Sequence, residues 1–361
     1  MIGRTFLFEL RHRWKGFTIF LIIVLIVVAG MVQLFPVTID AMEEDVDELE
    51  GEDNVRIQVE NETVWLNWDR VENASYYKVL EDTGSHMATS REVARTEENH
   101  TELQYDNGER YYAVLAGFDE EEEVLVGMSS TVERKSPIEE LMEAPYFRAF
   151  TAGRPDVDFR EIEGFLSIEL YSWWFLLVGL YLAYVSVNNV TKDYEDKRLD
   201  MIFSNPVSRM NFLMEKFSAL AFYTLLLLTV SSLVLMGSLY SIGEVREFGV
   251  WEAFASMLGA WPLFLVVIAF SILFAVKFQR ARIAVGLSLM IALVMYALHI
   301  AGNMVDALEW LTTLTILTYW DYNSVILDGV FKTWHFVGLF ILAMIIFVGA
   351  LSLFDRQDIP T

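Results

Sequence analysis

The residue types that perform most protein chemistry are sparse in this chain. None of its 361 residues is cysteine, which excludes disulfides, thiolate metal sites and thiol catalysis. The five histidines lie far apart, without the spacing of a metal site. No G-x-x-x-x-G-K-[ST] sequence is present, so no nucleotide-binding loop of that kind is expected. We therefore predict no catalytic, metal-binding or cofactor-binding residues in this chain.

The most informative charged stretch is VSVNNVTKDYEDKRLDMIFSNPVSRMNFLMEKFSALAFY, residues 185–223. It leaves one apolar run, passes through mixed charges and enters the next apolar run. Pro206 restricts Asn205 to an extended or turn conformation. The pattern predicts a short helix over about Lys192–Phe203, followed by a corner. A short helix with mixed charges is a candidate docking site for a soluble partner.

The elements that would position this stretch are apolar runs long enough to cross a bilayer, whose core of roughly 30 Å needs about 20 helical residues. These six runs are approximately Phe17–Phe35, Leu170–Val190, Phe212–Tyr240, Ala253–Val276, Ile283–Ala301 and Trp334–Phe354. Pro262 is expected to kink the fourth run without ending it. The first run is long for a signal peptide and lacks a clear cleavage site after it, so we expect a retained span.

Lysine and arginine gather on one side of these spans, and that bias sets orientation in a membrane. The opposite short loops contain only Arg246 and Lys332. We predict a multi-pass protein of the cell membrane with both termini in the cytoplasm. The first residues, MIGRTFLFELRHRWKG, suit either an amphipathic helix in the inner interface or a merely basic flank.

The net charge of −24 comes almost wholly from one segment. Residues 40–163 hold 34 of the 50 Asp and Glu residues but only 11 of the 26 Lys and Arg residues. An acidic surface repels phosphate, so we expect no nucleic-acid partner. Such acidity favours adaptation to high external salt over a specific cation site, because the run Asp119–Glu123 lacks the ligand spacing of a calcium loop.

Within this external insert the apolar pattern changes to period two, which is typical of half-buried strands. Val64, Leu66 and Trp68 alternate with polar residues, as do Tyr77 with Val79 and Tyr112 with Val114 and Ala116. The pattern predicts an all-β sandwich. TVWLNWDRVENASYYKVLED and ERYYAVLAGFDEEEEVLVGMSS resemble the first and last strands of a fibronectin type III domain, with Trp68 as the core tryptophan. The family's corner tyrosine would fall at Arg110, which is a departure from the pattern.

The remainder resembles the permeases of type-2 ABC transporters. The stretch after the second span is similar to theirs in Glu195, the corner Ser204-Asn205-Pro206-Val207-Ser208-Arg209 and Lys216. Lys197-Arg198 replaces the Gly-Thr that usually follows the glutamate. The pieces ELRHRWKG, LFP, GFLSIELYS, YWDYNSVILDG and FDRQD also fit, in the family's order.

The resemblance implies a fold of six transmembrane helices with a β-sandwich inserted in the first external loop. We expect residues 1–36 to form an interfacial helix and the first span, residues 37–165 the acidic insert with its sandwich at about 54–135, and residues 166–361 the other five spans with a coupling segment at 191–211. It further implies that Gly302–Thr333 forms short helices over the exit, although an aromatic belt is an equally compatible interpretation.

The resemblance also implies partners. These are a separate ATP-binding subunit, which would hold ATP and Mg²⁺, a second permease subunit in a homo- or heterodimer, and the lipid bilayer; an extracellular partner of the insert is a further candidate. The residues expected to contact the ATPase are Asp193, Tyr194, Glu195, Lys197, Arg198, Asp200, Asn205, Pro206 and Arg209.

One face of the second span carries Tyr181, Tyr184 and Asn188, at i, i+3 and i+7. These side chains are candidates to line a translocation path, although interhelical contact or an interfacial belt is the favoured interpretation. The main functional hypothesis is the permease of an ATP-driven exporter. One alternative is a surface receptor or adhesion protein, for which a single span would suffice. Another is a secondary transporter, against which the lack of an acidic residue deep in any span argues.

Overall fold

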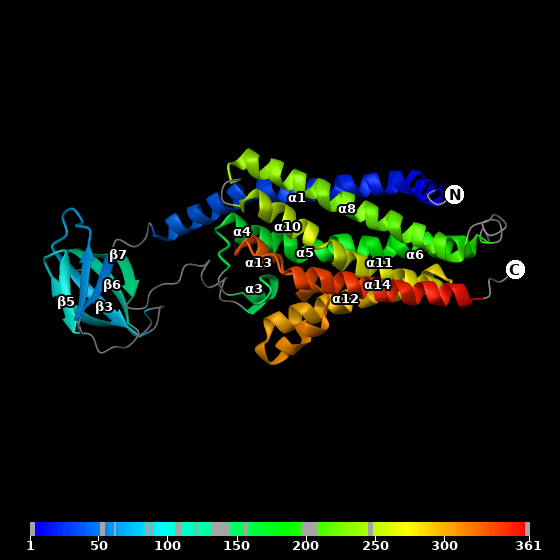
Figure 1. The fold of residues 1–361 in the computed structure, drawn as a ribbon. Helices are drawn as coiled ribbons and strands as arrows, with labels where there is room; N and C mark the ends of the chain where they lie inside the picture. Colours follow the sequence, from blue (N-terminus) through cyan, green and yellow to red (C-terminus); the bar gives the residue numbers. More distant parts are fainter. Residues whose placement is uncertain are drawn as a thin grey trace. The chain divides into compact units, whose positions relative to one another are not determined.

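The computed structural model describes residues 4–50, 55–60, 63–83, 87, 90–104, 110–119, 122–130, 145–154, 157–196, 199, 208–244 and 248–357. The chain divides into two compact units. The helical unit comprises Met1–Val37 and Met142–Thr361, and the insert comprises Thr38–Leu141 (Figure 1).

Six long apolar helices confirm the prediction of six membrane spans. They lie at Trp14–Ala41, Ile162–Glu195, Arg209–Ile242, Val250–Phe278, Ala281–Met304 and Thr333–Arg356. The elements that form them are α1 (Arg4–Glu50), α4 (Ile162–Leu166), α5 (Ser172–Trp174), α6 (Leu180–Glu195), α8 (Arg209–Ile242), α10 (Val250–Gly259), α11 (Trp261–Phe278), α12 (Ala281–Met304) and α14 (Thr333–Arg356), with π-helical turns η1 (Ser167–Tyr171) and η2 (Phe175–Gly179) in the second span. Shorter helices are α3 (Pro145–Phe150), the 3-10 helices η3 (Asp306–Leu314) and η4 (Leu317–Tyr319), and α13 (Tyr322–Ile326).

The fourth span is interrupted next to its proline. Helix α10 ends at Gly259, and α11 begins at Trp261 with Pro262 in its first turn. Proline is well tolerated there because the first N–H groups of a helix have no partner within it. The span therefore continues across a one-residue break, as expected of a kink that does not end it.

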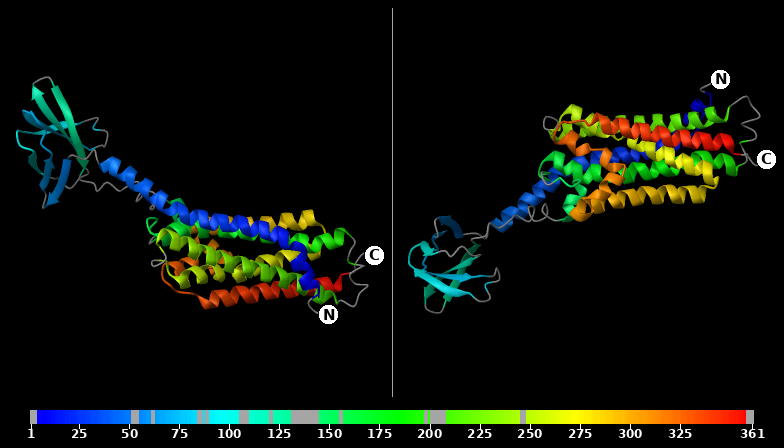
Figure 2. Two further views of the ribbon diagram at one scale, coloured as in Figure 1. Left: turned by 90° about the horizontal axis from the view of Figure 1, so that it is seen from above. Right: turned by 60° about the horizontal axis from the view of Figure 1, so that its bottom comes forward.

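Helix α11 occupies the centre of the helical unit, where it contacts α6, α8, α12 and α14. Its side chains from Pro262 to Ile272 are all buried. Figure 2 shows the spans running side by side, with both chain termini at one end of the unit. We call this the terminal end, and it also carries the end of α6 and the turn between α11 and α12. The opposite end carries α3, η3, η4 and α13 and is called the outer-helix end.

The insert folds into two antiparallel sheets. One has the strand order β1-β2-β5 and the other β4-β3-β6-β7. The strands are β1 (Val55–Glu60), β2 (Thr63–Trp68), β3 (Tyr76–Asp82), β4 (Arg91–Thr96), β5 (His100–Gln104), β6 (Tyr111–Asp119) and β7 (Glu122–Ser130). A β region of two sheets after the first helix is thereby confirmed.

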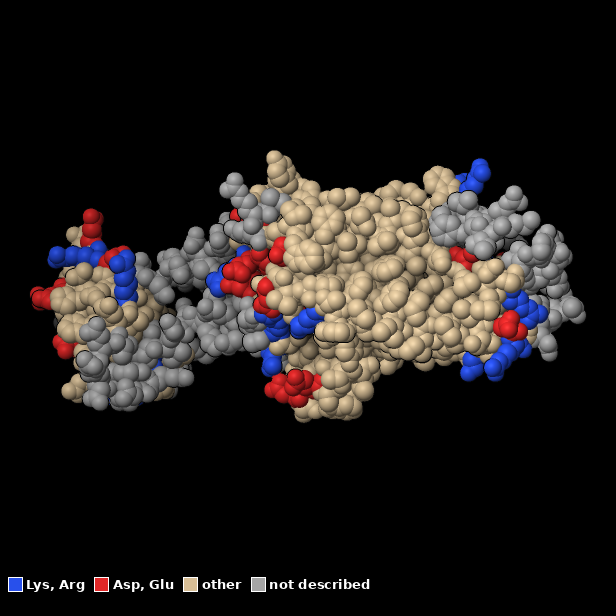
Figure 3. Space-filling model, viewed as in Figure 1, with Lys and Arg blue, Asp and Glu red and all other residues tan. Residues whose placement is uncertain are grey.

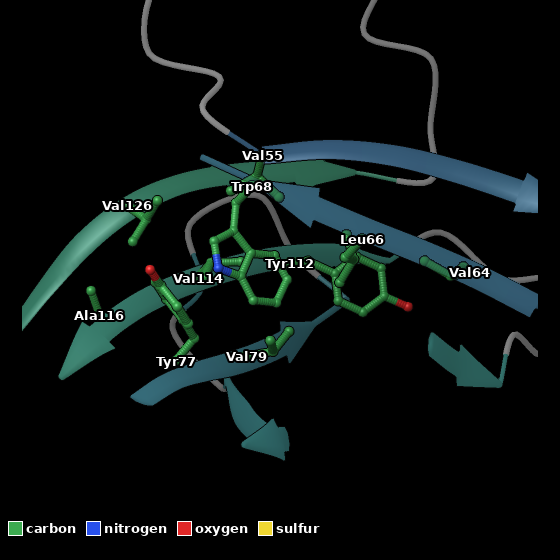
Figure 4. Close-up of a cluster of buried hydrophobic side chains, with 10 residues drawn as sticks. All are labelled: Val55, Val64, Leu66, Trp68, Tyr77, Val79, Tyr112, Val114, Ala116 and Val126. Atoms are coloured by element: carbon green, nitrogen blue, oxygen red, sulfur yellow. The ribbon is translucent and has the colours of Figure 1, made fainter. Parts of the chain in front are cut away.

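The two sheets share one apolar core (Figure 4). Every residue of the three alternating runs that the sequence singled out is buried in it. Trp68 meets Tyr77 edge to face, with ring centroids 5.4 Å apart. The alternation in β2, β3 and β6 therefore comes from one face of each strand pointing into this core.

A buried carboxylate lies at the edge of this core. Glu81 accepts hydrogen bonds from Arg91, at 2.7 and 3.1 Å, and from the hydroxyl of Tyr112. Arg110 stands directly before β6 with Nε 3.4 Å from Glu81 Oε1. The arginine at the position of the expected corner tyrosine thus helps to neutralise a buried acid.

Candidate functional site

The coupling residues predicted from sequence fall partly on described positions. Asp193, Tyr194 and Glu195 form the last turn of α6, and Arg209 is the first residue of α8. The others, Lys197, Arg198, Asp200, Asn205 and Pro206, lie outside the described residues.

The predicted start of a separate helix at Lys192 is wrong. Helix α6 runs without interruption through Glu195, and the N–H of Asp196 still bonds to the carbonyl of Lys192 at 2.9 Å. The charged residues extend the helix of the second span by one turn because nothing in Thr191–Glu195 breaks it: proline and glycine are absent there. Among the predicted docking residues, Asp193, Tyr194 and Glu195 are therefore continuous with that span.

Asp193 faces the interior rather than a partner. Its Oδ2 is 2.8 Å from Nζ of Lys216, which is only 1% exposed. Lys216 also donates to Asn189, to the backbone oxygen at 2.8 Å and to Oδ1 at 3.2 Å. All three donors of the ammonium thus have an acceptor on α6, as a buried charge requires. This cluster fastens α8 to α6.

Glu195 connects α6 to a different span. Its Oε1 accepts a hydrogen bond of 2.9 Å from the backbone N–H of Ala281, the first residue of α12. The preceding residue, Arg280, makes no side-chain cap, so this N–H is one of the donors that a helix cannot satisfy internally. The carboxylate also lies at the positive end of the helix dipole. Glu195 therefore acts as a cap from another helix.

A third connection runs through Gln357, which follows α14. Its Oε1 accepts from Tyr194 at 3.4 Å and from Gln279 at 3.1 Å, and its Nε2 donates to the carbonyl of Val276 at 3.0 Å. Its carbonyl accepts from Arg209 at 2.7 Å. The tail sequence FDRQD is part of the family resemblance. Its Gln357 joins the end of α14 to α6, α8 and α11.

These contacts border an open hollow at the terminal end. Its volume is about 520 Å³, and it is lined by Tyr194, Glu195, Phe278, Gln279, Arg280 and Ile283. Gln279 adopts a left-handed conformation with φ of 54°, which makes the turn between α11 and α12 sharp. The hollow therefore joins the end of α6 to that turn, a feature that sequence spacing alone does not reveal.

The three candidate path residues differ in their surroundings. The ring of Tyr181 stacks on Phe20 of α1, with centroids 3.5 Å apart, so it makes an interhelical contact. Tyr184 is 53% exposed on the surface of the helical unit. Asn188 donates to the carbonyl of Tyr184 in its own helix, at 2.9 Å. Of the three, Tyr184 is exposed, and Tyr181 and Asn188 are half-buried.

The outer-helix end is held by a buried polar network. Asn323 of α13 accepts from Ser167 at 2.5 Å and donates to the carbonyl of Thr151 at 2.8 Å. Trp320 donates to the carbonyl of Ser256 in α10, at 2.9 Å. Trp320 is buried, unlike Trp310 on η3. The region that the resemblance assigned to short helices is thus anchored to the second and fourth spans.

Among the described residues, no cluster of three or more His, Asp or Glu side chains could hold a metal ion. The site at the terminal end instead offers hydrogen bonds and charge between helix ends, in a bundle with six candidate membrane spans. These contacts join the ends of several spans, and the protein belongs to the class of multi-pass membrane proteins.

Residues 9–359 match the family profile described as ABC-2 family transporter protein. The match covers nearly the whole chain, and the chain belongs to this family. It is a membrane-embedded transport subunit without catalytic activity of its own, and membership implies an ATPase subunit as partner. No curated protein and no solved structure matched the chain.

Proposed function

We propose that this chain is the permease subunit of an ATP-driven exporter, which moves a substrate outward with energy from a separate ATPase. The bias of lysine and arginine in the short loops supports a cytoplasmic terminal end and an external insert. ATP and Mg²⁺ would be bound by the partner. Two copies of the permease, identical or different, would form the working unit.

The observation that carries this proposal is that the last turn of α6 is tied to three other spans. Asp193 connects it to α8, Glu195 to α12, and Tyr194, through Gln357, to the end of α14. A partner that displaces the segment after α6 would therefore move several helix ends together. Such a displacement would switch the permease between two conformations. Bound ATP would stabilise one of them, and the absence of ATP the other.

We propose that the ATPase binds the segment 193–209, with the hollow beside Glu195 and Arg280 as part of the contact. The hollow is open, and its rim combines a carboxylate and a guanidinium at the ends of two spans. Polar rims of this kind favour specific docking more than raw affinity. Asp193 and Arg209 would then act from behind the contact, since they bond within the bundle, whereas Tyr194 lines the hollow itself.

Tyr184 and Asn188 are the remaining candidates for the substrate path. Tyr184 is exposed on α6 and Asn188 half-buried one turn further on, and a second permease could enclose both. For the insert, the strand orders β1-β2-β5 and β4-β3-β6-β7 support the proposal of a fibronectin type III-like sandwich. We also propose that its acidity is an adaptation to high external salt.

The test is co-purification from native membranes in mild detergent, with mass spectrometry of the proteins that co-elute. We expect an ATP-binding subunit in roughly equal amount, weakened in Glu195→Ala and in Arg198→Ala. Glu102→Ala, on an exposed position of β5, is the matched control and should retain it. A preparation without any ATPase, or with only extracellular proteins bound through the insert, would favour a receptor or adhesion protein and refute the exporter.

A further inference from the structure

A polar cavity of about 500 Å³ opens at the outer-helix end of the helical unit. Its walls come from α3 and the turn after it, the end of α12, η3, and the region from Leu317 to Lys332. Figure 3 shows acidic and basic side chains side by side at this end, whereas the flank of the unit is almost free of charge. The size is that of sites for small molecules, but the lining is more polar than is usual for apolar ligands.

One wall of the cavity presents two carboxylates on adjacent turns. Asp306 and Glu309 belong to the 3-10 helix η3, in which residues three apart lie directly above one another. Thr312 continues the same face and packs against α12 at Gly302, where a Cβ would lie 2.7 Å from Thr312 Cγ2. This close contact holds the face of η3 against α12, so that both acids border the cavity.

The facing wall presents a cation with a spare donor. Arg148 of α3 donates from Nη2 to Asp306 Oδ1 at 3.2 Å, while its Nε is buried without a partner among the described residues. A buried N–H without an acceptor is costly, and a bound anionic oxygen would remove that cost. Glu309, across the cavity, makes no ion pair within the described part of the chain.

The other charges of the lining are already paired. Arg154 makes two hydrogen bonds to Asp328, at 2.6 and 3.1 Å. Lys332 is ion-paired with Asp321. These charges are neutralised within the chain and need no ligand. The groups left for a ligand are therefore Arg148, with one buried donor that has no partner among the described residues, and the solvent-exposed carboxylate of Glu309, which have opposite charge.

We propose that this cavity binds a small zwitterion. Its anionic group, a carboxylate or a phosphate, would accept from Arg148, and its ammonium would lie between Asp306 and Glu309. His299, Asn303 and Thr318 line the cavity as well and offer neutral hydrogen-bonding groups to the rest of the ligand. A ligand with both charges suits this lining, because a cation, Arg148, and two acids, Asp306 and Glu309, border it together. The source is either a free solute or the headgroup of a zwitterionic lipid.

The proposal is tested by calorimetric titration of the purified full-length chain in a non-ionic detergent. The probes are L-glutamine, as a free zwitterion, and glycerophosphoethanolamine, as a lipid headgroup. N-acetyl-L-glutamine lacks the ammonium, and 4-aminobutanamide lacks the carboxylate. We expect saturable binding of at least one zwitterion at millimolar concentration, and binding at least about tenfold weaker for the glutamine analogues if glutamine binds.

Variants locate the ligand. Glu309→Gln and Arg148→Gln should each weaken binding of the zwitterion about tenfold, since each removes one charge-assisted contact. Arg160→Gln is the control, because Arg160 pairs locally with Asp158 and does not line the cavity. Comparison of nanodiscs of phosphatidylethanolamine with nanodiscs of phosphatidylglycerol separates the sources. A headgroup site should be blocked to added glycerophosphoethanolamine in the former only, and a solute site should bind L-glutamine in both.

The proposal is overturned if neither zwitterion binds saturably, if the analogues that lack one charge bind as well as L-glutamine, or if both cavity variants bind like the control. Because the titration requires no ATPase, its outcome is independent of the co-purification that tests the exporter.

Discussion

The carboxylate of Glu195 at the end of α6 caps the first N–H of α12, at Ala281, over a distance of 2.9 Å. The two residues are 86 positions apart in sequence. Helices are usually capped by a side chain just before their first turn, and a cap from another helix makes the start of one span depend on the position of another. Movement of the end of α6 would therefore displace the start of α12. The far end of α12 borders the cavity at the outer-helix end, through His299 and Asn303.

The first prediction concerns this cap. Replacing Glu195 by alanine should cost about 1 kcal/mol of stability, as for other lost helix caps, but should impair ATP-driven transport far more. Glu195→Gln keeps an acceptor for the N–H of Ala281 and should retain more activity. Transport and thermal unfolding are measured on the complex in proteoliposomes and in detergent, respectively. Equal transport by the wild type and the alanine variant would refute a coupling role for the cap.

The second prediction concerns the buried ion pair of Lys216 and Asp193. Lys216→Met leaves the carboxylate of Asp193 without its cation and should lower the stability by about 3–5 kcal/mol. Lys216→Met combined with Asp193→Asn should recover part of that loss, because no buried charge remains unpaired. Thermal unfolding of both variants and of Asp193→Asn alone completes the cycle. Strictly additive losses would show that the two side chains do not interact.

The six spans were predictable because a helix that crosses a bilayer needs a long apolar run, and such a run can be recognised in the sequence directly. The strands of the insert were predictable for a similar reason: Val64, Leu66 and Trp68 alternate because only one face of β2 meets the core. In both cases the pattern is local, because the polarity of each residue depends on its own surroundings.

The contacts at the terminal end were not predictable, because they join residues that are distant in sequence. Gln357 gives no local signal that it will meet Tyr194 and Gln279, and nothing near Ala281 shows that Glu195 will cap it. The end of α6 was misplaced for a related reason. The charged residues after Thr191 looked like a new element, although helical hydrogen bonding simply continues through them.

The third prediction separates the two faces of strand β2. Trp68 is 3% exposed in the insert core, whereas Trp65 is 38% exposed on the other face. Trp68→Ala should destabilise the insert by about 3–5 kcal/mol, and Trp65→Ala should cost much less. Limited proteolysis of the full chain should therefore cut the insert of the first variant and spare its helical unit. Equal resistance of the two variants would contradict the assignment of the core.

The fourth prediction tests salt adaptation of the insert. Raising the salt from about 0.1 M to about 1 M shortens the screening length from about 10 Å to about 3 Å, which weakens repulsion among its acids. Resistance of the insert to proteolysis should rise accordingly. The double variant Glu97→Gln and Glu102→Gln removes two exposed acids and should show a smaller rise. The same salt dependence in that variant and in the wild type would refute the electrostatic explanation.

The last prediction concerns Asp321, which precedes α13. Burial disfavours its charged form, but hydrogen bonds from Lys332 and from the N–H and hydroxyl of Ser324 outweigh that effect and lower the pKa of the Asp321 carboxyl below its usual range. A group with a lowered pKa in the folded state stabilises the fold above its unfolded pKa of about 3.9, and this contribution is lost as the pH falls through the folded value.

Acidification below about pH 4 should therefore loosen the α13 region, where Asp321 also caps the helix by accepting from the N–H of Ser324 at 3.0 Å. Hydrogen exchange of peptides that cover α13 measures the effect. Asp321→Asn should weaken protection at neutral pH and flatten the acid dependence, because the amide does not titrate. Glu309→Gln, at an exposed acid without an ion pair in the described part of the chain, serves as the control. An unchanged acid dependence in Asp321→Asn would place the responsible carboxyl elsewhere.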